Sequence, residues 1–422
     1  MSKLAAPRFR ALPFGAIWLC YFGAIGLFSP YSPLWLSSLG YSTLAIGAFA
    51  SLQSWTRVVA PYGWGWMADH TRQRVTLLRL AAVLSMLAAG GLWLARDAGP
   101  WPLALVVAAL FLANGAITPI GEALLLKHLH SSDGLDARRY GRVRVWGSIG
   151  FIVSVLLFGF VLQRTGIAAL PLFTLGLFAL LALATWTLPN PVEPTELQRV
   201  SVAVWPVLRQ PQVGWFFVGV MLTVLAHSSL YAFFSLYLSQ LGYGKPAVGM
   251  LWAVAVAAEI LFFMLAGRHF SLMNEHRWLV LAALVSAARF ALTAAFADVT
   301  VVLVVAQLTH ALTFAAQHMA CTSLIASHFP DRLRARGQAL YSTLGYGVPG
   351  VIGGVAGGLL SEAFGLAAVF WAAAGVALVA AGCCAMSGRA QRAAALAAQA
   401  EAQRAGSVAG EAANRSTDNP AG

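Results

Sequence analysis

The stretch LWLSSLGYSTLAIG, Leu34–Gly47, returns almost unchanged as LYLSQLGYGKPAVG, Leu236–Gly249. The two copies are 202 residues apart, and in both an apolar segment ends at Leu-Gly-Tyr before the next apolar segment begins. A weaker echo pairs RRYGRVRVWGS, Arg138–Ser148, with RARGQALYSTL, Arg334–Leu344, each at the start of an apolar segment after a basic loop. The chain therefore consists of two copies of one unit.

The composition indicates a membrane protein. Of the 422 residues, 59% are hydrophobic and only 10% are charged, whereas roughly a quarter of the residues of a soluble protein are charged. Apolar runs long enough to cross about 30 Å of hydrocarbon recur along the whole chain. We predict helices near residues 13–38, 44–67, 75–95, 101–127, 143–163, 167–188, 213–240, 246–268, 277–297, 299–327, 336–361 and 365–387.

The repeat and the twelve predicted spans together define the expected fold class. It is an all-α polytopic membrane protein with twelve transmembrane helices in two pseudo-symmetric six-helix bundles. Parallel repeats of this kind are a transporter architecture. The expected parts are a cytoplasmic N-terminus (1–12), an N-terminal bundle (13–188), a cytoplasmic linker (189–212), a C-terminal bundle (213–387) and a partly disordered cytoplasmic tail (388–422).

Local sequence features predict details of the helices. Pro30 and Pro33 are expected to break the first helix, and Pro61 the second. Glycines spaced by four residues, at Gly350, Gly354 and Gly358, would allow another helix to approach closely. The Ala-rich run RAQRAAALAAQAEAQRAGS after residue 388 predicts a separate surface helix, with disorder beyond it.

The net charge of +12 is distributed as membrane orientation requires, not as nucleic-acid binding requires. The side opposite the cytoplasm keeps only Arg96, Arg164 and Lys245. The cytoplasmic side takes the basic residues Lys3, Arg8, Arg10, Arg72, Arg74, Arg79, Lys127, Arg138, Arg139, Arg142, Arg199, Arg209, Arg268, Arg277, Arg332, Arg334 and Arg336. Both termini are thus expected in the cytoplasm of a bacterium, with the chain a monomer in the inner membrane and no nucleic-acid partner.

Five ionisable residues fall inside predicted spans, where each costs a few kcal/mol unless it faces a cavity or a partner. Arg57 aligns with Glu259 at the same shift of 202, so the two halves place opposite charges at one depth. The other three are Glu122, Arg144 and Arg289. They could be structural ion pairs that lock helices together, or a substrate and proton site between the halves. Because the charges occupy both halves, the central site is favoured.

Further side chains near these charges indicate a substrate class. His310, with Gln307 one turn before it, lies within a span, as does His227, whereas His318 lies nearer the cytoplasmic end and receives no role. Three Arg against two Glu leave one positive charge, which a substrate carboxylate would neutralise, and arginine suits bidentate carboxylate binding. A flat apolar ligand body could rest among the aromatic residues Tyr21, Phe28, Tyr31, Trp35, Phe151, Tyr231, Phe233, Phe234, Tyr341 and Tyr346.

Three motifs resemble the major facilitator superfamily over roughly residues 10–388. GWMADHTRQR is similar to the family's gating loop after helix 2, with its Gly65, Asp69, Arg72 and Arg74. RRYGRVRVWGSIGF resembles the start of helix 5 in the branch that contains lactose permease and the 3-phenylpropionate transporters. The set Glu259, Arg289 and His310, one on each of helices 8, 9 and 10, also resembles that branch.

The resemblance implies proton symport by alternating access, and roles for individual residues. Glu122 and Arg144 occupy the positions that grip the sugar in lactose permease. Phe151 stands where a tryptophan stacks on that sugar, which disfavours a sugar substrate. Thr313 replaces a carboxylate one turn after His310, so the proton would be carried by Glu259 or Glu122.

The hypothesis from sequence is a proton symporter for a small organic anion, an aromatic carboxylate such as a phenylpropanoid acid. The substrate would pair with Arg144 or Arg57, and Glu259 would release its proton as Arg289 approaches. Sugar or nucleoside symport and drug or metabolite efflux remain open alternatives on the same fold. An enzyme is disfavoured because no HExxH, GxSxG or phosphate-loop motif is present, and no cofactor or metal site is expected. A sensor or an ion channel is disfavoured too.

Overall fold

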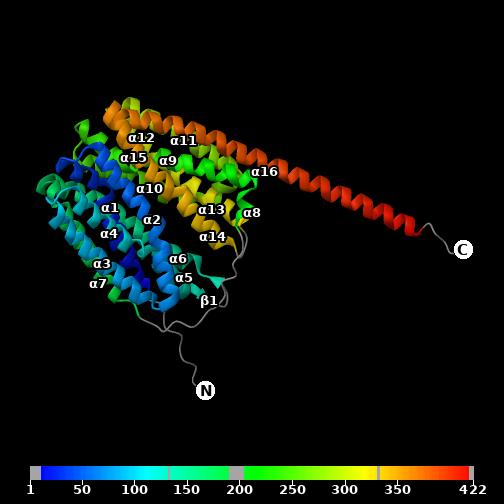
Figure 1. Cartoon of the computed structure of the whole chain (residues 1–422), viewed down its shortest axis with the longest axis horizontal. Coiled ribbons are helices and arrows are strands. Elements are labelled where there is room, and N and C mark those ends of the chain that lie inside the picture. The colour runs from blue at the N-terminus through cyan, green and yellow to red at the C-terminus, as the bar shows by residue number, and fades with distance from the viewer. Residues whose placement is uncertain (1–10, 132–133, 190–203, 330–332, 418–422) are drawn as a thin grey trace, which may run out of the picture.

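The computed structural model describes residues 11–131, 134–189, 204–329 and 333–417 (Figure 1). Eleven helices among the described residues are long and apolar enough to cross a membrane. One further helix of 29 residues, Thr43–Thr71, packs beside them. The expected all-α polytopic fold is confirmed, with one two-stranded hairpin as its only described β structure.

The N-terminal half contributes five of these eleven helices and the further helix Thr43–Thr71; one of the five, residues 100–129, is in two pieces. Its elements are α1 (Ala11–Ser38), α2 (Thr43–Thr71), α3 (Arg74–Ala95), α4 (Pro100–Asn114), α5 (Ile117–Leu129), β1 (His130–Ser131), β2 (Gly134–Leu135), α6 (Ala137–Thr165), η1 (Ile167–Ala169) and α7 (Leu170–Trp186).

The C-terminal half repeats this order after a short helix. Its elements are α8 (Trp205–Leu208), α9 (Pro211–Gln240), α10 (Lys245–His269), η2 (Phe270–Leu272), α11 (Glu275–Phe296), α12 (Thr300–Leu308), η3 (Ala311–Ala316), α13 (Gln317–His328), α14 (Arg334–Leu340), η5 (Tyr341–Gly347), α15 (Val348–Phe364) and α16 (Leu366–Thr417). The η3 and η5 segments are π-helical. The predicted linker lies largely outside the described residues, as do residues 1–10 and 418–422.

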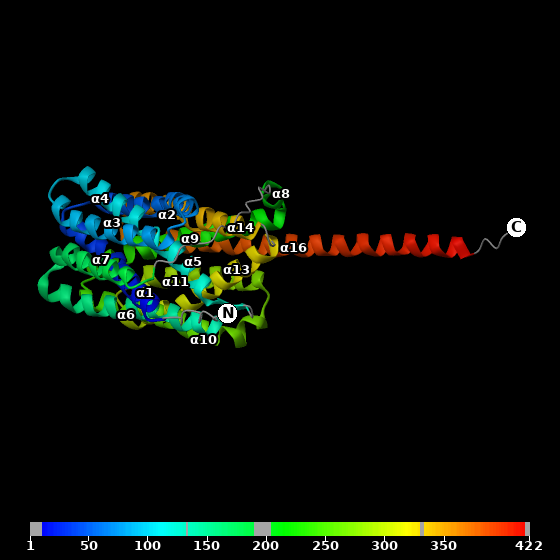
Figure 2. The same cartoon turned by 90° about the horizontal axis from the view of Figure 1, so that it is seen from below.

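Each half packs within itself, and two helix pairs make the most extensive contacts between the halves. In the first half α1 packs on α6 and α7, and α3 packs on α4 and α7; in the second, α16 packs on α9 and α11. Across the halves, α2 packs on α15 and α6 on α10. The two bundles lie side by side in Figures 1 and 2, and the site described below lies between them.

The repeated Leu-Gly-Tyr stretch builds the same turn twice. Gly40 has φ +85° and Gly242 has φ +86°, a left-handed conformation that glycine adopts without steric cost. In each turn the tyrosine N–H returns to a helix carbonyl, Tyr41 to Leu36 and Tyr243 to Leu238. The next helices begin 202 residues apart, at Thr43 and Lys245, which confirms the repeat. We call the end of the molecule that carries these turns the motif end.

Small residues let the halves meet near the motif end. A Cβ atom added to Gly354 would overlap the Gly47 carbonyl, and one added to Gly358 would lie 2.8 Å from the Leu44 Cα. The Ser51 hydroxyl donates a 2.7 Å hydrogen bond to the Val351 carbonyl across the same crossing. The glycine spacing on α15 therefore serves close helix contact, as predicted.

Three expected helix shapes are wrong. The prolines do not break α1 or α2, which run through Pro30, Pro33 and Pro61 without a gap. A proline removes one backbone bond, and packing against neighbouring helices compensates for that loss. The predicted helix 101–127 is instead interrupted at Gly115, where an added Cβ would lie 2.6 Å from the Ala60 Cβ.

The last helix also differs from its prediction. α16 does not end at residue 387 but continues to Thr417 as one helix that projects from the bundle (Figures 1 and 2). Alanine, the strongest helix former, is the commonest residue after Gly388, so one glycine does not end the helix. The Ser387 hydroxyl ties this region to the body by a 2.7 Å hydrogen bond to the Gln212 carbonyl.

Candidate functional site

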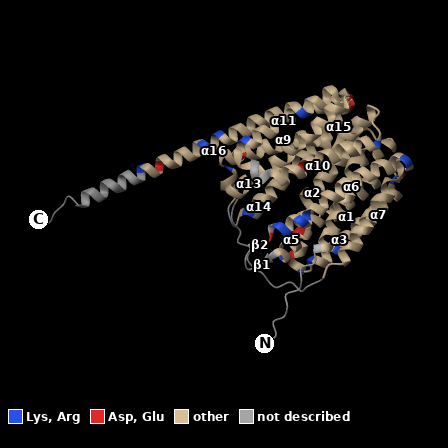
Figure 3. Ribbon diagram, turned by 180° about the vertical axis from the view of Figure 1, so that it is seen from behind, with Lys and Arg blue, Asp and Glu red and all other residues tan. Residues whose placement is uncertain are grey.

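The described charges are sparse along the middle of the helices and gather around α5 and the β hairpin (Figure 3). The few charged residues within the bundle therefore mark the candidate site. Five predicted residues, Glu122, Arg144, Glu259, Arg289 and His310, form two clusters, one in each half. The sixth, Arg57, has a side chain outside the described ones; its position in α2 matches that of Glu259 in α10, the fifteenth residue of each helix.

Arg289 anchors the cluster of the C-terminal half. It lies on α11 and is only 1% exposed. Its guanidinium donates to the His310 Nδ1 at 3.0 Å, to the Thr313 hydroxyl at 3.1 Å and to the Gln307 side-chain oxygen. A buried charge is stable only when it is hydrogen-bonded in this way. The guanidinium is thus fully engaged by protein groups and held in one place.

His310 connects Arg289 to Glu259. Its Nε2 lies 3.9 Å from the Glu259 Oε2. Because arginine can only donate, the His310 Nδ1 must accept, and the ring's single proton therefore sits on Nε2, facing the carboxylate. A doubly protonated ring would direct an N–H at the guanidinium. Arg289 thereby holds His310 in its neutral form and leaves Glu259 as the group of this cluster able to bind a proton.

Glu122 and Arg144 form the cluster of the N-terminal half. The Arg144 Nε lies 3.2 Å from the Glu122 Oε1, and the Tyr140 hydroxyl donates to the Glu122 Oε2 at 2.9 Å. The guanidinium also rests over two rings, 4.5 Å from the Phe22 centroid and 5.2 Å from that of Trp18. Its side chain remains 33% exposed, so it can still receive a ligand.

The two clusters face one another across the halves. Arg144 lies close enough to Glu259 to interact with it electrostatically, and the Glu259 side chain is 22% exposed. Both side chains are partly exposed, and they belong to α6 and α10, which pack on one another across the halves. The described charges there are two arginines and two glutamates, which balance.

Phe151 and the predicted gating loop lie outside these clusters. Phe151 follows Arg144 by seven residues on α6, two turns along the same face, and its ring is half-buried against the core. The loop prediction is wrong in shape: Gly65 and Asp69 belong to α2, which ends at Thr71 because Arg72 adopts φ 54°. The Arg74 Nη2 and Asp69 Oδ1 are 3.9 Å apart.

Tyr140 is the site residue that sequence reasoning missed. It lies one turn before Arg144 on α6 and hydrogen-bonds the same glutamate that pairs with Arg144. The signal was available, because side chains four residues apart share a helix face. The signal was weak, because tyrosine is common at membrane–water interfaces whether or not a site is present.

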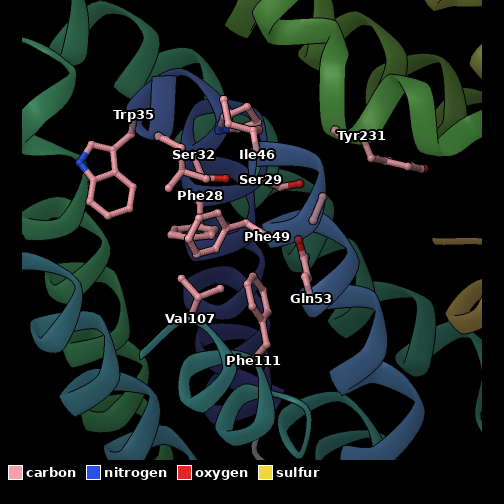
Figure 4. Close-up of a pocket in the computed structure, with 14 residues that line it drawn as sticks. Phe28, Ser29, Ser32, Trp35, Ile46, Phe49, Gln53, Val107, Phe111 and Tyr231 are labelled. Carbon is pink, nitrogen blue, oxygen red and sulfur yellow. The ribbon is translucent and has the colours of Figure 1, made fainter. Parts of the chain in front are cut away.

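A small pocket opens nearer the motif end (Figure 4). It is lined by residues of α1, α2 and α4, with Tyr231 from α9 of the other half, and its polar groups include Ser29, Ser32 and Gln53. The cavity measures about 30 Å³, whereas one water needs roughly 10–15 Å³ and a cavity that binds benzene measures about 150 Å³. In this conformation it can admit water but not an aromatic ring.

Known proteins resemble the chain over most of its length. A family model described as the MFS_1 like family matches residues 13–372. A probable 3-phenylpropionic acid transporter of Escherichia coli is 29% identical over 85% of this chain and 93% of its own length. A maltose permease of Geobacillus stearothermophilus is 31% identical over 86% of this chain and 90% of its own length.

Solved structures agree on the fold. The crystal structure of nucleoside transporter NupG superposes with a TM-score of 0.78 at 17% identity, covering 89% of this chain and 98% of that one. The relatives indicate a transporter rather than an enzyme, and they confirm the resemblance drawn from the motifs. The chain belongs to the MFS_1-like family and is a multi-pass membrane transporter of the major facilitator type.

Proposed function

We propose that this transporter imports a small aromatic carboxylate together with protons, by alternating access across a bacterial inner membrane with both termini in the cytoplasm. The observation that carries the proposal is the setting of Arg144. Its guanidinium is partly exposed, pairs with Glu122 and lies over two aromatic rings. Arginine matches carboxylate geometry, and the rings suit the apolar body of the ligand.

Arg289 is not the substrate's partner in this proposal. It is buried and already bound to three protein groups, whereas Arg144 has open surface. Arg57 remains the second candidate for carboxylate binding, as the sequence suggested, and Phe151 a candidate contact for the ring. Asp69, Gly65, Arg72 and Arg74 are proposed to gate the cytoplasmic end.

The setting of Glu259 supports coupling to a proton. Its carboxyl is partly exposed and lies 3.9 Å from the Nε2 of His310, which Arg289 holds in its neutral form. An ionised carboxylate without a cation hydrogen-bonded to it is costly inside the membrane. We therefore propose that Glu259 carries the proton, and that Arg289 and His310 set its environment.

The deciding experiment is uptake of labelled 3-phenylpropionate into proteoliposomes with an inward proton gradient. We expect accumulation that a protonophore abolishes. Glu259→Gln should lose accumulation but keep exchange of internal for external substrate, because the neutral amide mimics the protonated acid. Glu401→Gln on the projecting part of α16 is the matched control and should behave as wild type. Accumulation by Glu259→Gln that remains fully proton-driven would refute the assignment.

A sugar or nucleoside is the second candidate substrate, because the maltose permease and the nucleoside transporter also resemble this chain. The same proteoliposomes test it with labelled maltose and uridine. Gradient-driven accumulation of either, with none of 3-phenylpropionate, would replace the aromatic carboxylate while keeping the transport mechanism.

A further inference from the structure

Two tyrosine hydroxyls meet on the π-helical segment η5. The Tyr341 and Tyr346 oxygens lie 3.1 Å apart, within hydrogen-bonding distance. Five residues cover about 1.4 turns of an α-helix, which would direct these side chains apart. A π turn closes between residues i and i+5 and brings them together instead. The irregular segment thus has a specific consequence, the pairing of two hydroxyl groups.

The pair continues to His318 on the neighbouring α13. The Tyr341 hydroxyl lies 3.3 Å from the His318 Nδ1, and the His318 side chain is exposed. Tyr341 itself is 3% exposed, so its hydroxyl depends on protein partners; the Cys321 thiol also lies against it. The His318 ring is stacked on Phe314, which in turn is stacked on His310. These parallel rings hold His318 in place toward Tyr341.

The other end of the row points toward the proposed proton site. Tyr346 is close enough to both Glu259 and Tyr231 to interact with them electrostatically. Of the two tyrosines, Tyr346 is therefore the one that interacts with Glu259. The sequence Tyr346, Tyr341, His318 leads from Glu259 to an exposed imidazole.

We propose that Tyr346, Tyr341 and His318 form the route by which the proton leaves Glu259 for the cytoplasm. The inference rests on the proposed function, because it assumes that Glu259 carries a transported proton. It assigns a role to His318, which neither the substrate nor the Glu259 cluster uses.

The transfer balances along the row. The Glu259 carboxyl O–H breaks and the Tyr346 oxygen accepts that proton as its own proton passes to the Tyr341 oxygen. The Tyr341 proton moves to the His318 Nδ1, and the imidazolium releases its Nε2 proton to water. Glu259 is left ionised and one proton has entered the cytoplasm. Rotation of the two hydroxyls and a flip of the His318 ring, which returns an unprotonated nitrogen to the Tyr341 hydroxyl, reset the row.

The test separates steps that move a proton from steps that do not. Wild type, Tyr346→Phe, Tyr341→Phe and His318→Gln are reconstituted in proteoliposomes, and labelled 3-phenylpropionate is followed in two assays. Net uptake driven by a proton gradient requires release of the proton inside, whereas exchange at equal pH does not. We expect net uptake by the variants to fall by about a hundredfold, the lower range for a lost proton-transfer group, with exchange within about twofold of wild type.

Tyr237→Phe is the matched control. It removes a hydroxyl of the same half that donates to the Ala294 carbonyl, away from the row, and both of its rates should equal those of wild type. Wild-type net uptake in Tyr346→Phe and Tyr341→Phe would overturn the route while leaving symport standing. An equal loss of both rates would mean a structural role and would also overturn it. Wild-type protein without proton-driven uptake would refute the proposed function, and the route with it.

Discussion

At the scale of single residues, the site depends on which groups are buried and which are open. Arg289 and Arg144 both look like intramembrane arginines in the sequence, yet one is 1% exposed and the other 33%. Burial makes Arg289 an internal anchor, and exposure leaves Arg144 free to meet a ligand. The difference in burial therefore gives Arg289 and Arg144 different functions.

Replacing Arg289 by alanine should destabilise the protein by several kcal/mol, at about 1–3 kcal/mol for each buried polar partner left unsatisfied. Gln307, His310 and Thr313 would each lose the donor that they now share. The measurement is thermal unfolding in detergent. Arg277→Ala, on the exposed first turn of the same helix, should change stability by no more than about 0.5 kcal/mol. Equal unfolding temperatures of the two variants would contradict the anchor role.

At the scale of elements, the irregular helices carry the chemistry. Spans that are regular, such as α3 and α7, pack the bundle, whereas His310 immediately precedes a π turn and Tyr341 begins another. π turns occur often at functional sites. The sequence offered no sign of them, because a π turn inserts a residue into an apolar run without changing its composition.

The α2–α15 crossing provides a prediction for one element pair. Gly354→Val should force α2 and α15 apart, because a side chain there overlaps the Gly47 carbonyl and the Ser51 hydroxyl. Spin labels at Ser37 and Gln240, exposed residues of opposite halves at the motif end, should then report a longer distance. Gly375→Val is the control, since nothing lies within 4 Å of a Cβ at that position. An unchanged distance in Gly354→Val would contradict this prediction, because the added side chain would then be accommodated without separating α2 from α15.

At the scale of the whole molecule, the two six-helix units contact each other at two helix crossings. Equivalent residues of the sequence repeat lie in both crossings. Gly47 lies in the α2–α15 crossing and its repeat partner, Gly249, in the α6–α10 crossing, where an added Cβ would lie 2.5 Å from the Val155 carbonyl. The pseudo-symmetry therefore extends from the turns to the contacts between halves, as rocking of one half against the other requires.

The projecting part of α16 should be dispensable for transport. From residue 393 to residue 404 its side chains are exposed, and the helix extends away from the bundle. A chain that stops after Arg392 should accumulate substrate at the wild-type rate and unfold at the same temperature. The comparison is made on purified protein, so that a change in expression is not mistaken for a change in rate. A loss of uptake would show that the projecting helix takes part in the transport cycle.

The sequence by itself determined the class of molecule and most of the site's membership. Composition required the membrane, and the Leu-Gly-Tyr copies required two halves. Five charged residues within spans, and His310 beside them, were identified because such groups are costly in hydrocarbon. Only the tertiary structure decided how they combine. Which arginine is buried, which nitrogen of His310 faces Glu259, and that Tyr140 reaches Glu122 all depend on distances between separate helices, which periodicity along one chain does not encode. The continuous α1 and α2 follow the same logic, since neighbouring helices stabilise what a local proline signal would break.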